Sequence, residues 1–131
     1  MSNHYSQRSK ERLETCDFRL VVVFRDALKL IDHSILCGHR GRESQTKMYE
    51  LGRSKLPWPY GKHNSSPARA VDAAPYPYDP TDIERICLFA GIVIGVAAKM
   101  GIKIRWGGDW DRDTEIKDTK FRDLFHYELV D

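Results

Sequence analysis

Cysteine is scarce and scattered in this chain of 131 residues. Cys16, Cys37 and Cys87 are odd in number and form no CxxC pair, which excludes a dense disulfide framework and a thiolate zinc site. We interpret them as small, mostly buried thiols. Cys37 lies two residues from His39, but neighbours in one apolar run do not make a catalytic pair, so the pattern disfavours a cysteine nucleophile.

The chain also lacks long apolar runs and an excess of one charge. The N-terminus "MSNHYSQRSKERLETCD" has no apolar signal-peptide core, and "ICLFAGIVIGVAAKMG" is too short and too well bounded for a membrane span. We therefore expect a protein made in the cytoplasm, without stable membrane insertion. The net charge is +2, with 21 basic and 19 acidic residues interspersed, which disfavours nucleic-acid binding through "RSKER" and "GRSK".

Several common catalytic motifs are absent as well. The chain contains no HExxH helix, no GxSxG turn, no P-loop and no GxGxxG. Asp109, Asp111 and Asp113 alternate like the start of a calcium loop, but Thr114 replaces the expected glycine and Lys120 the closing carboxylate. A solvated acidic loop is the simpler interpretation, and a cation site stays open.

The patterns that are present predict an α+β domain, with a small antiparallel sheet packed against a few helices. We assign residues 1–131 to one domain, with 1–17 as an N-terminal segment and 18–131 as the core. Helical spacing, helix formers and caps, including a Thr81 and Glu84 capping box, predict helices over 18–31, 43–52 and 79–101. Short apolar or alternating runs predict strands within 34–40, 69–74, 102–106 and 123–130.

Three side chains could supply the ligands of a hydrolytic zinc, which needs about three N or O donors and an open position. His63 lies in a proline-rich loop, Asp72 in a predicted strand and His126 in the last strand. Because Asp is depleted from strands and poorly tolerated when buried alone, Asp72 is either an ion-pair partner or a ligand. Taken singly, His63 is more simply a surface residue and His126 a core histidine, so spacing alone leaves both open.

Further charged residues could act beside such a metal. Glu128 should share a strand face with His126, where it would serve the metal or bind substrate. Asp123 precedes His126 by three residues and could act as general base, a role for which Glu128 competes. Arg40 could stabilise an oxyanion or simply form a salt bridge.

Four blocks of the sequence resemble a known family. "GHRGRESQ", "KHNSSPARAVDAAPYP", "RWGGDWD" and "FRDLFHYEL" resemble the zinc peptidases of the D-alanyl-D-alanine carboxypeptidase and VanY type, especially the phage endolysin branch that cleaves between L-alanine and D-glutamate. The resemblance implies a Hedgehog and D-Ala-D-Ala peptidase-like fold, and Zn2+ held by His63, Asp72 and His126. It also implies Asp123 as the catalytic carboxylate and Arg40 as a substrate or transition-state contact.

The sequence departs from the wider family in the first ligand block. That block is commonly SxHxxGxAxD, with seven positions from His to Asp, whereas His63 and Asp72 here are nine positions apart and Gly61 replaces the Ser. We expect a bulged loop in the interval. Ser66 and Arg69, within it, either contact substrate or shape the loop. Trp106 and Trp110 flank a Gly-Gly turn and line the peptide site, or else pack in the core or at its rim.

The function implied by the resemblance is that of a phage endolysin. A monomer would remain in the host cytoplasm until the membrane is permeabilised, and would then hydrolyse the L-alanyl-D-glutamate bond of peptidoglycan stem peptides. We expect no nucleic-acid partner. The sequence leaves open a D,D-carboxypeptidase or dipeptidase of the same fold, and a non-catalytic zinc-stabilised peptidoglycan-binding module.

Overall fold

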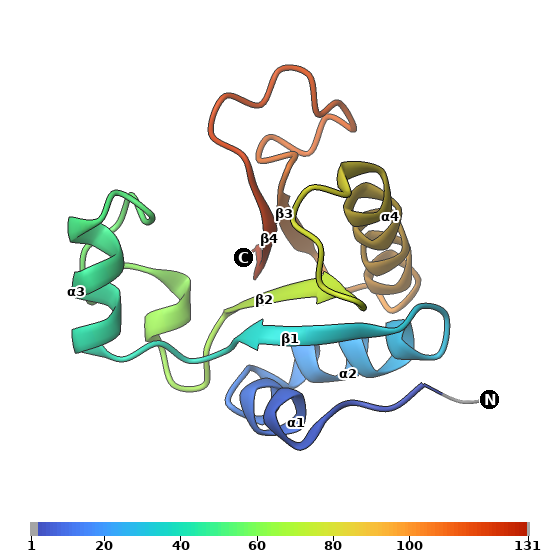
Figure 1. The fold of residues 1–131 in the computed structure, drawn as a ribbon, viewed down its shortest axis with the longest axis horizontal. Coiled ribbons are helices and arrows are strands. Elements are labelled where there is room, and N and C mark those ends of the chain that lie inside the picture. The colour runs from blue at the N-terminus through green and yellow to red at the C-terminus, as the bar shows by residue number, and fades with distance from the viewer. Residues whose placement is uncertain (1–2, 131) are drawn as a thin grey trace.

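The computed structural model describes residues 3–130 and has a four-stranded antiparallel sheet with helices packed against it (Figure 1). The strand order is β1-β2-β4-β3, so β2 and β4 are central. This confirms the predicted α+β class. Among the described residues, no helix is long and apolar enough to cross a membrane. In chain order the elements are α1 (Gln7–Glu14), α2 (Phe18–Leu28), β1 (His33–Cys37), α3 (Arg42–Glu50), the 3-10 turn η1 (Lys62–Asn64), β2 (Ala70–Pro75), α4 (Ile83–Lys99), β3 (Ile104–Gly107) and β4 (Asp123–Leu129).

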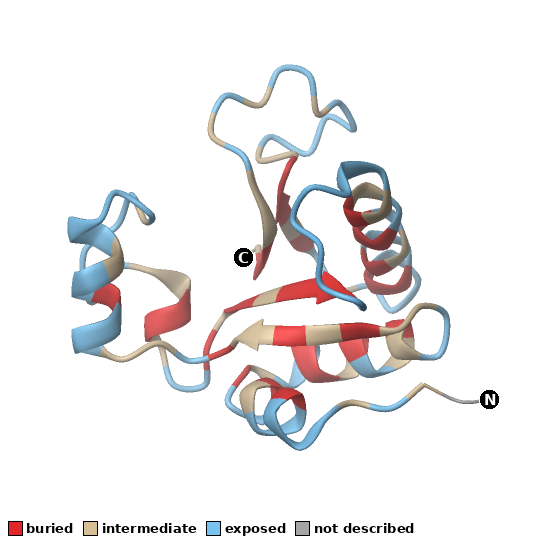
Figure 2. Cartoon of the chain, in the orientation of Figure 1, coloured by how far each residue is buried: buried red, intermediate tan, exposed pale blue. Residues whose placement is uncertain are grey.

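One face of the sheet carries the hydrophobic core. Val71 of β2 lies opposite Tyr127 of β4, and both are fully buried. The Tyr127 ring contacts Phe24 of α2 and Phe89 of α4 edge-on, with centroids 5.4 and 5.9 Å apart. Figure 2 shows the buried sides of α2 and α4 turned toward the sheet. Because strand residues alternate between faces, Asp72, next to Val71, lies on the opposite face.

The N-terminal segment belongs to this core, although the expected boundary lay at residue 18. Leu13 and Cys16 join the buried cluster, and the Ser9 hydroxyl accepts a hydrogen bond from the Ile35 N–H of β1 at 3.0 Å. The segment therefore covers the β1 edge of the sheet. The helix α1 was not predicted, because "QRSKERLE" has only Leu13 as an apolar residue and so shows no apolar stripe.

The start of α4 corrects the predicted capping box. Asp82 is the N-cap, and its carboxylate accepts the Arg85 N–H at 3.2 Å. The Thr81 hydroxyl instead donates to Asp79 at 2.6 Å, so the helix begins one residue later than a Thr81 cap implies. The predicted end is close to the observed one, since the chain leaves the helix through Gly101 at φ +72°.

A β-bulge in β1 determines which side chains share a face with Asp72. Ile35 pairs with Ala73 and points into the core. A register shift then pairs Cys37 with Asp72. In a regular strand Cys37 would continue the face of Ile35, because residues two apart share a face. The bulge therefore turns Cys37 to the side of Asp72.

Candidate metal centre

His63, Asp72 and His126 converge on the face of the sheet opposite the core. Asp72 and His126 are paired in register, and η1 brings His63 beside them. Asp72 Oδ1 lies 3.2 Å from His63 Nε2 and 3.3 Å from His126 Nδ1. One ligand atom from each residue lies within 4.8 Å of the others. Three donors from separate elements thus meet at one point.

Hydrogen bonds fix the orientation of both imidazoles. His63 Nδ1 donates to the Gly38 carbonyl at 2.7 Å, which leaves Nε2 facing Asp72. His126 Nε2 faces Glu128 Oε1 at 2.8 Å, which leaves Nδ1 facing Asp72. A carbonyl or carboxylate on the far nitrogen is the usual support of a metal-binding histidine, because it selects the tautomer and fixes the ring.

Asp72 controls the protonation of both imidazoles. Burial works to lower the pKa of His63, but hydrogen bonds to Asp72 and Cys37 outweigh it and raise the pKa to about 10. Burial is likewise outweighed at His126, whose pKa is raised by Asp72 and Glu128. In spite of burial, hydrogen bonds to His126 and His63 lower the pKa of Asp72. The group of His63, Asp72 and His126 therefore stabilises positive charge. Its two nitrogen donors and one oxygen donor fit zinc, which must displace the imidazole protons in order to bind.

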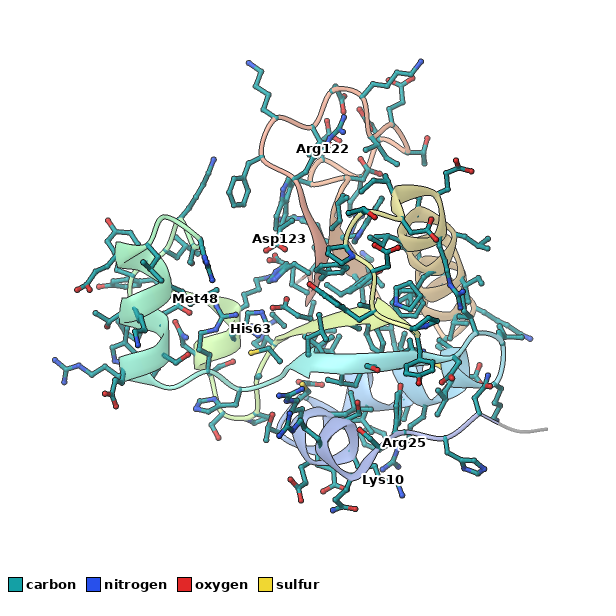
Figure 3. All side chains as sticks on the ribbon, in the orientation of Figure 1. Lys10, Arg25, Met48, His63, Arg122 and Asp123 are labelled. Carbon is teal, nitrogen blue, oxygen red and sulfur yellow. The ribbon has the colours of Figure 1, made fainter. Side chains whose placement is uncertain are left out.

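A cavity of about 750 Å³ opens in front of these donors, and Asp123 lines it. Burial, followed by the negative charge of Asp72, raises the pKa of the Asp123 carboxyl. A carboxyl group of raised pKa is suited to accept and return a proton near neutral pH. In Figure 3, Met48 from α3 and Arg122 from the segment before β4 mark the two walls, and His63 and Asp123 lie between them.

Arg40 reaches the group from the turn after β1. Its Nη2 lies 3.4 Å from Asp72 Oδ2, and its Nη1 donates to Gln45 Oε1 at 3.1 Å. Gln45, only 1% exposed, also donates to Ser54 Oγ at 2.9 Å and to the Leu56 carbonyl at 2.6 Å. Gln45 was not predicted, because a glutamine in a polar helix ordinarily faces solvent.

Two of the predicted substrate-binding residues line the same cavity. The Trp110 ring lies 5.4 Å from that of His126. Glu128 shares the face of His126, as expected, but its Oε2 is occupied by Lys62 Nζ at 3.3 Å and Arg105 Nη1 at 3.7 Å. The geometry thus gives Glu128 the position of a support for His126.

The other three are not among the residues that line this cavity. Ser66 is exposed on the turn that leads to β2, and the Arg69 backbone N–H donates to the Lys62 carbonyl at 2.8 Å. Trp106 is 4% exposed, and its indole donates to the Leu124 carbonyl at 2.8 Å. Their positions favour the alternatives of loop shaping and core packing.

The acidic loop does gather its carboxylates. One oxygen each from Asp109, Asp111 and Asp113 lies within 4.8 Å of the others. Asp109 accepts the backbone N–H groups of Asp113 and Thr114 at 3.2 and 2.9 Å. These hydrogen bonds explain why the carboxylates lie close together: they stabilise the local structure of the loop.

The fold and the donor group together define a small α+β protein with a candidate hydrolytic metal centre. Residues 1–130 match the family described as phage L-alanyl-D-glutamate peptidase, and the chain belongs to that family. The L-alanyl-D-glutamate peptidase of Escherichia phage T5 is 30% identical over 138 residues, covering 99% of this chain and 100% of that protein. The crystal structure of the Serratia marcescens L-Ala D-Glu endopeptidase ChiX matches with a TM-score of 0.76 and 26% identity, over 98% of this chain and 91% of that one. The predicted family is confirmed.

Proposed function

We propose that this chain is a zinc-dependent endopeptidase that hydrolyses the L-alanyl-D-glutamate bond of peptidoglycan stem peptides, and that it acts as a phage endolysin. The observation that carries the proposal is the convergence of His63, Asp72 and His126 beside the buried carboxyl of Asp123 on one cavity. Membership of the peptidase family supports the reaction and the bond. The proposal includes action as a monomer, first in the host cytoplasm and then at the wall once the membrane is permeabilised.

In this proposal His63, Asp72 and His126 would hold the zinc. The chemistry that zinc supplies in such a centre is polarisation of a carbonyl and a lowered pKa of water. Glu128 keeps His126 in the required tautomer. Since Lys62 and Arg105 also occupy Glu128, the free carboxyl at the cavity is that of Asp123.

Asp123 is assigned the proton transfers. It accepts a proton from the attacking water as the water oxygen bonds to the scissile carbonyl carbon, and it returns that proton to the amine nitrogen as the C–N bond breaks. Its raised pKa suits both directions of transfer. Arg40, held by Gln45 and Asp72, supplies positive charge where the carbonyl oxygen becomes negative.

Digestion of purified stem peptides, followed by mass spectrometry, tests the reaction. The expected products carry L-alanine at a new carboxyl end and D-glutamate at a new amino end. Release of terminal D-alanine would identify a D,D-carboxypeptidase instead. Binding to peptidoglycan without any fragments would identify a binding module.

The variant Asp123→Asn tests the assigned base. We expect a loss of roughly 10²- to 10⁴-fold in kcat with zinc content unchanged, because the amide cannot take up the proton. Asp26→Asn on α2, whose carboxylate pairs with Lys29 and does not line the cavity, is the matched control. Parental activity in a zinc-loaded Asp123→Asn enzyme would refute the role.

A further inference from the structure

The cavity in front of the candidate metal centre carries more positive charge than the proposed reaction uses. Six Lys and Arg side chains line it, against three carboxylates. The net charge of the whole chain is only +2, so basic residues are concentrated at this one hollow. A concave site lined by one sign of charge attracts ligands of the opposite sign.

Three of these basic side chains face the protein's own carboxylates. Lys62 and Arg105 lie 3.3 and 3.7 Å from Glu128 Oε2. Arg40 lies 3.4 Å from Asp72 Oδ2. Each of these three cations therefore already has a carboxylate partner within the protein.

Within residues 3–130, the other three lining cations have no carboxylate partner. Arg122 donates to the Ile116 carbonyl at 3.1 Å. Within residues 3–130, neither Arg53 nor Lys55 forms an ion pair with a carboxylate. Lys55 Nζ instead lies 4.3 Å above the centroid of the Phe121 ring, on the opposite wall. Arg53 and Lys55 are thus available to an anionic ligand in the cavity.

The segment that carries Arg53 and Lys55 is held in place by hydrogen bonds from Gln45 of α3. The buried Gln45 amide donates to Ser54 Oγ and to the Leu56 carbonyl, at 2.9 and 2.6 Å. These contacts anchor the residues on either side of Lys55, and Arg53 directly precedes the first of them. Two cations on an anchored segment bind a ligand with less loss of backbone entropy than cations on a mobile loop.

We propose that Arg53 and Lys55 bind a carboxylate that the substrate carries outside the scissile bond, so that the enzyme selects anionic stem peptides. This inference rests on the proposed function, which names the stem peptide as the ligand. A guanidinium forms paired hydrogen bonds with a carboxylate, and an ammonium adds a point charge. The carboxylate comes either from the carbon that bears the leaving amine of the D-glutamyl residue or from the C-terminal end of the peptide.

Synthetic tetrapeptides with each carboxylate free or amidated distinguish the two sources. In the parent enzyme, amidation of the bound carboxylate should raise KM about tenfold with little change in kcat, as expected for a lost charge-assisted contact outside the reacting atoms. The double variant Arg53→Gln, Lys55→Gln should cleave the acid and amide peptides with nearly equal KM. Arg53→Lys with Lys55→Arg should largely restore the preference.

Lys47→Gln is the matched control, because Lys47 is exposed on α3 and is not among the cavity-lining residues. It should keep the parental preference. Equal KM for acid and amide peptides in the parent, or an unchanged preference in the double variant, would overturn the inference.

A failure of the proposed function gives a different result. If the parent cleaves none of the peptides, calorimetric binding of the same peptides to the Asp123→Asn protein still decides the question. The anion site is supported, even though the reaction is not, if binding needs a free carboxylate and weakens when Arg53→Gln and Lys55→Gln are added to Asp123→Asn. Binding that is indifferent to amidation overturns it.

Discussion

The two faces of the sheet each bury a histidine, and the two imidazoles are in opposite electrostatic environments. On the core face, His33 is 2% exposed and its ring centroid lies 4.7 Å from that of Phe89. Its Nδ1 donates to the Ile31 carbonyl at 2.9 Å, and Nε2 contacts the Tyr5 hydroxyl at 2.5 Å. Burial lowers the pKa of His33 to about 4. This imidazole is neutral and structural.

On the other face, His63 is 4% exposed, nearly as buried as His33, yet its pKa is raised to about 10. The difference lies in the neighbours: Asp72 accepts a hydrogen bond from His63, whereas aromatic rings surround His33. Burial by itself therefore does not mark a functional histidine. A buried carboxylate between two imidazoles does, because it creates a place where positive charge is stable.

The largest expected effect comes from removing that carboxylate's charge. Asp72→Asn should weaken zinc binding by more than ~100-fold, because a ligand contributes more than the outer contacts that are worth 10- to 100-fold. Peptidase activity should fall with it, and the pKa of His63 should drop toward the low value of His33. Metal analysis after dialysis and NMR titration of the imidazoles measure both effects. Parental zinc content in this variant would show that Asp72 is not a ligand.

The core histidine should affect stability rather than metal binding. Its pKa is about 4 in the fold against 6.5 unfolded, so the unfolded chain binds the extra proton between these values, and folding stability falls as pH drops from 6.5 to 4. The full loss is about 3 kcal/mol. Urea unfolding of the parent and His33→Gln at pH 7 and pH 4 should give a flatter pH dependence for the variant. Parallel curves would contradict the prediction.

A smaller effect should follow from Glu128→Gln. The neutral amide holds His126 less firmly in its tautomer, so zinc affinity should fall by roughly 10- to 100-fold. At saturating zinc, kcat should stay far closer to the parental value than in Asp123→Asn. Competitive zinc titration and peptide kinetics separate the two quantities. A kcat loss at saturating zinc as large as that of Asp123→Asn would instead make Glu128 the base.

The smallest signal should be the protons exchanged on metal binding. The pKa of His63 is raised to about 10, so its imidazole holds the extra proton at pH 7, while Asp72 with its lowered pKa holds none. The pKa of His126 is also raised, which increases the protonated fraction of its imidazole. Zinc binding to chelator-treated protein should therefore release about one proton from His63 and a further share from His126, and affinity should rise with pH. Calorimetry in buffers of different ionisation enthalpy counts them. Release of none would mean that the imidazoles are neutral, as His33 is.

The elements with strong periodicity were predictable. The short apolar segment "RAVDAA" and the alternation in "DLFHYELV" located β2 and β4, and the long apolar run located α4. The helix α1 escaped prediction because its stabilising contacts come from β1, through Ser9, and not from an apolar stripe of its own. Gln45 escaped for a similar reason, since its four hydrogen-bond partners are distant in sequence or outside its helix.

The sequence by itself determined which residues could carry the chemistry. Asp72 in an apolar strand and Glu128 two residues after His126 follow from local pattern, because a strand's period fixes the face of each of its own side chains. Only the tertiary structure decided which other side chains lie beside them. Antiparallel pairing sets Asp72 opposite His126, and η1 brings His63 to the same carboxylate. The charge on a buried imidazole depends on the side chains that lie next to it in space. Strand register and loop path determine those neighbours, and no local sequence pattern contains either.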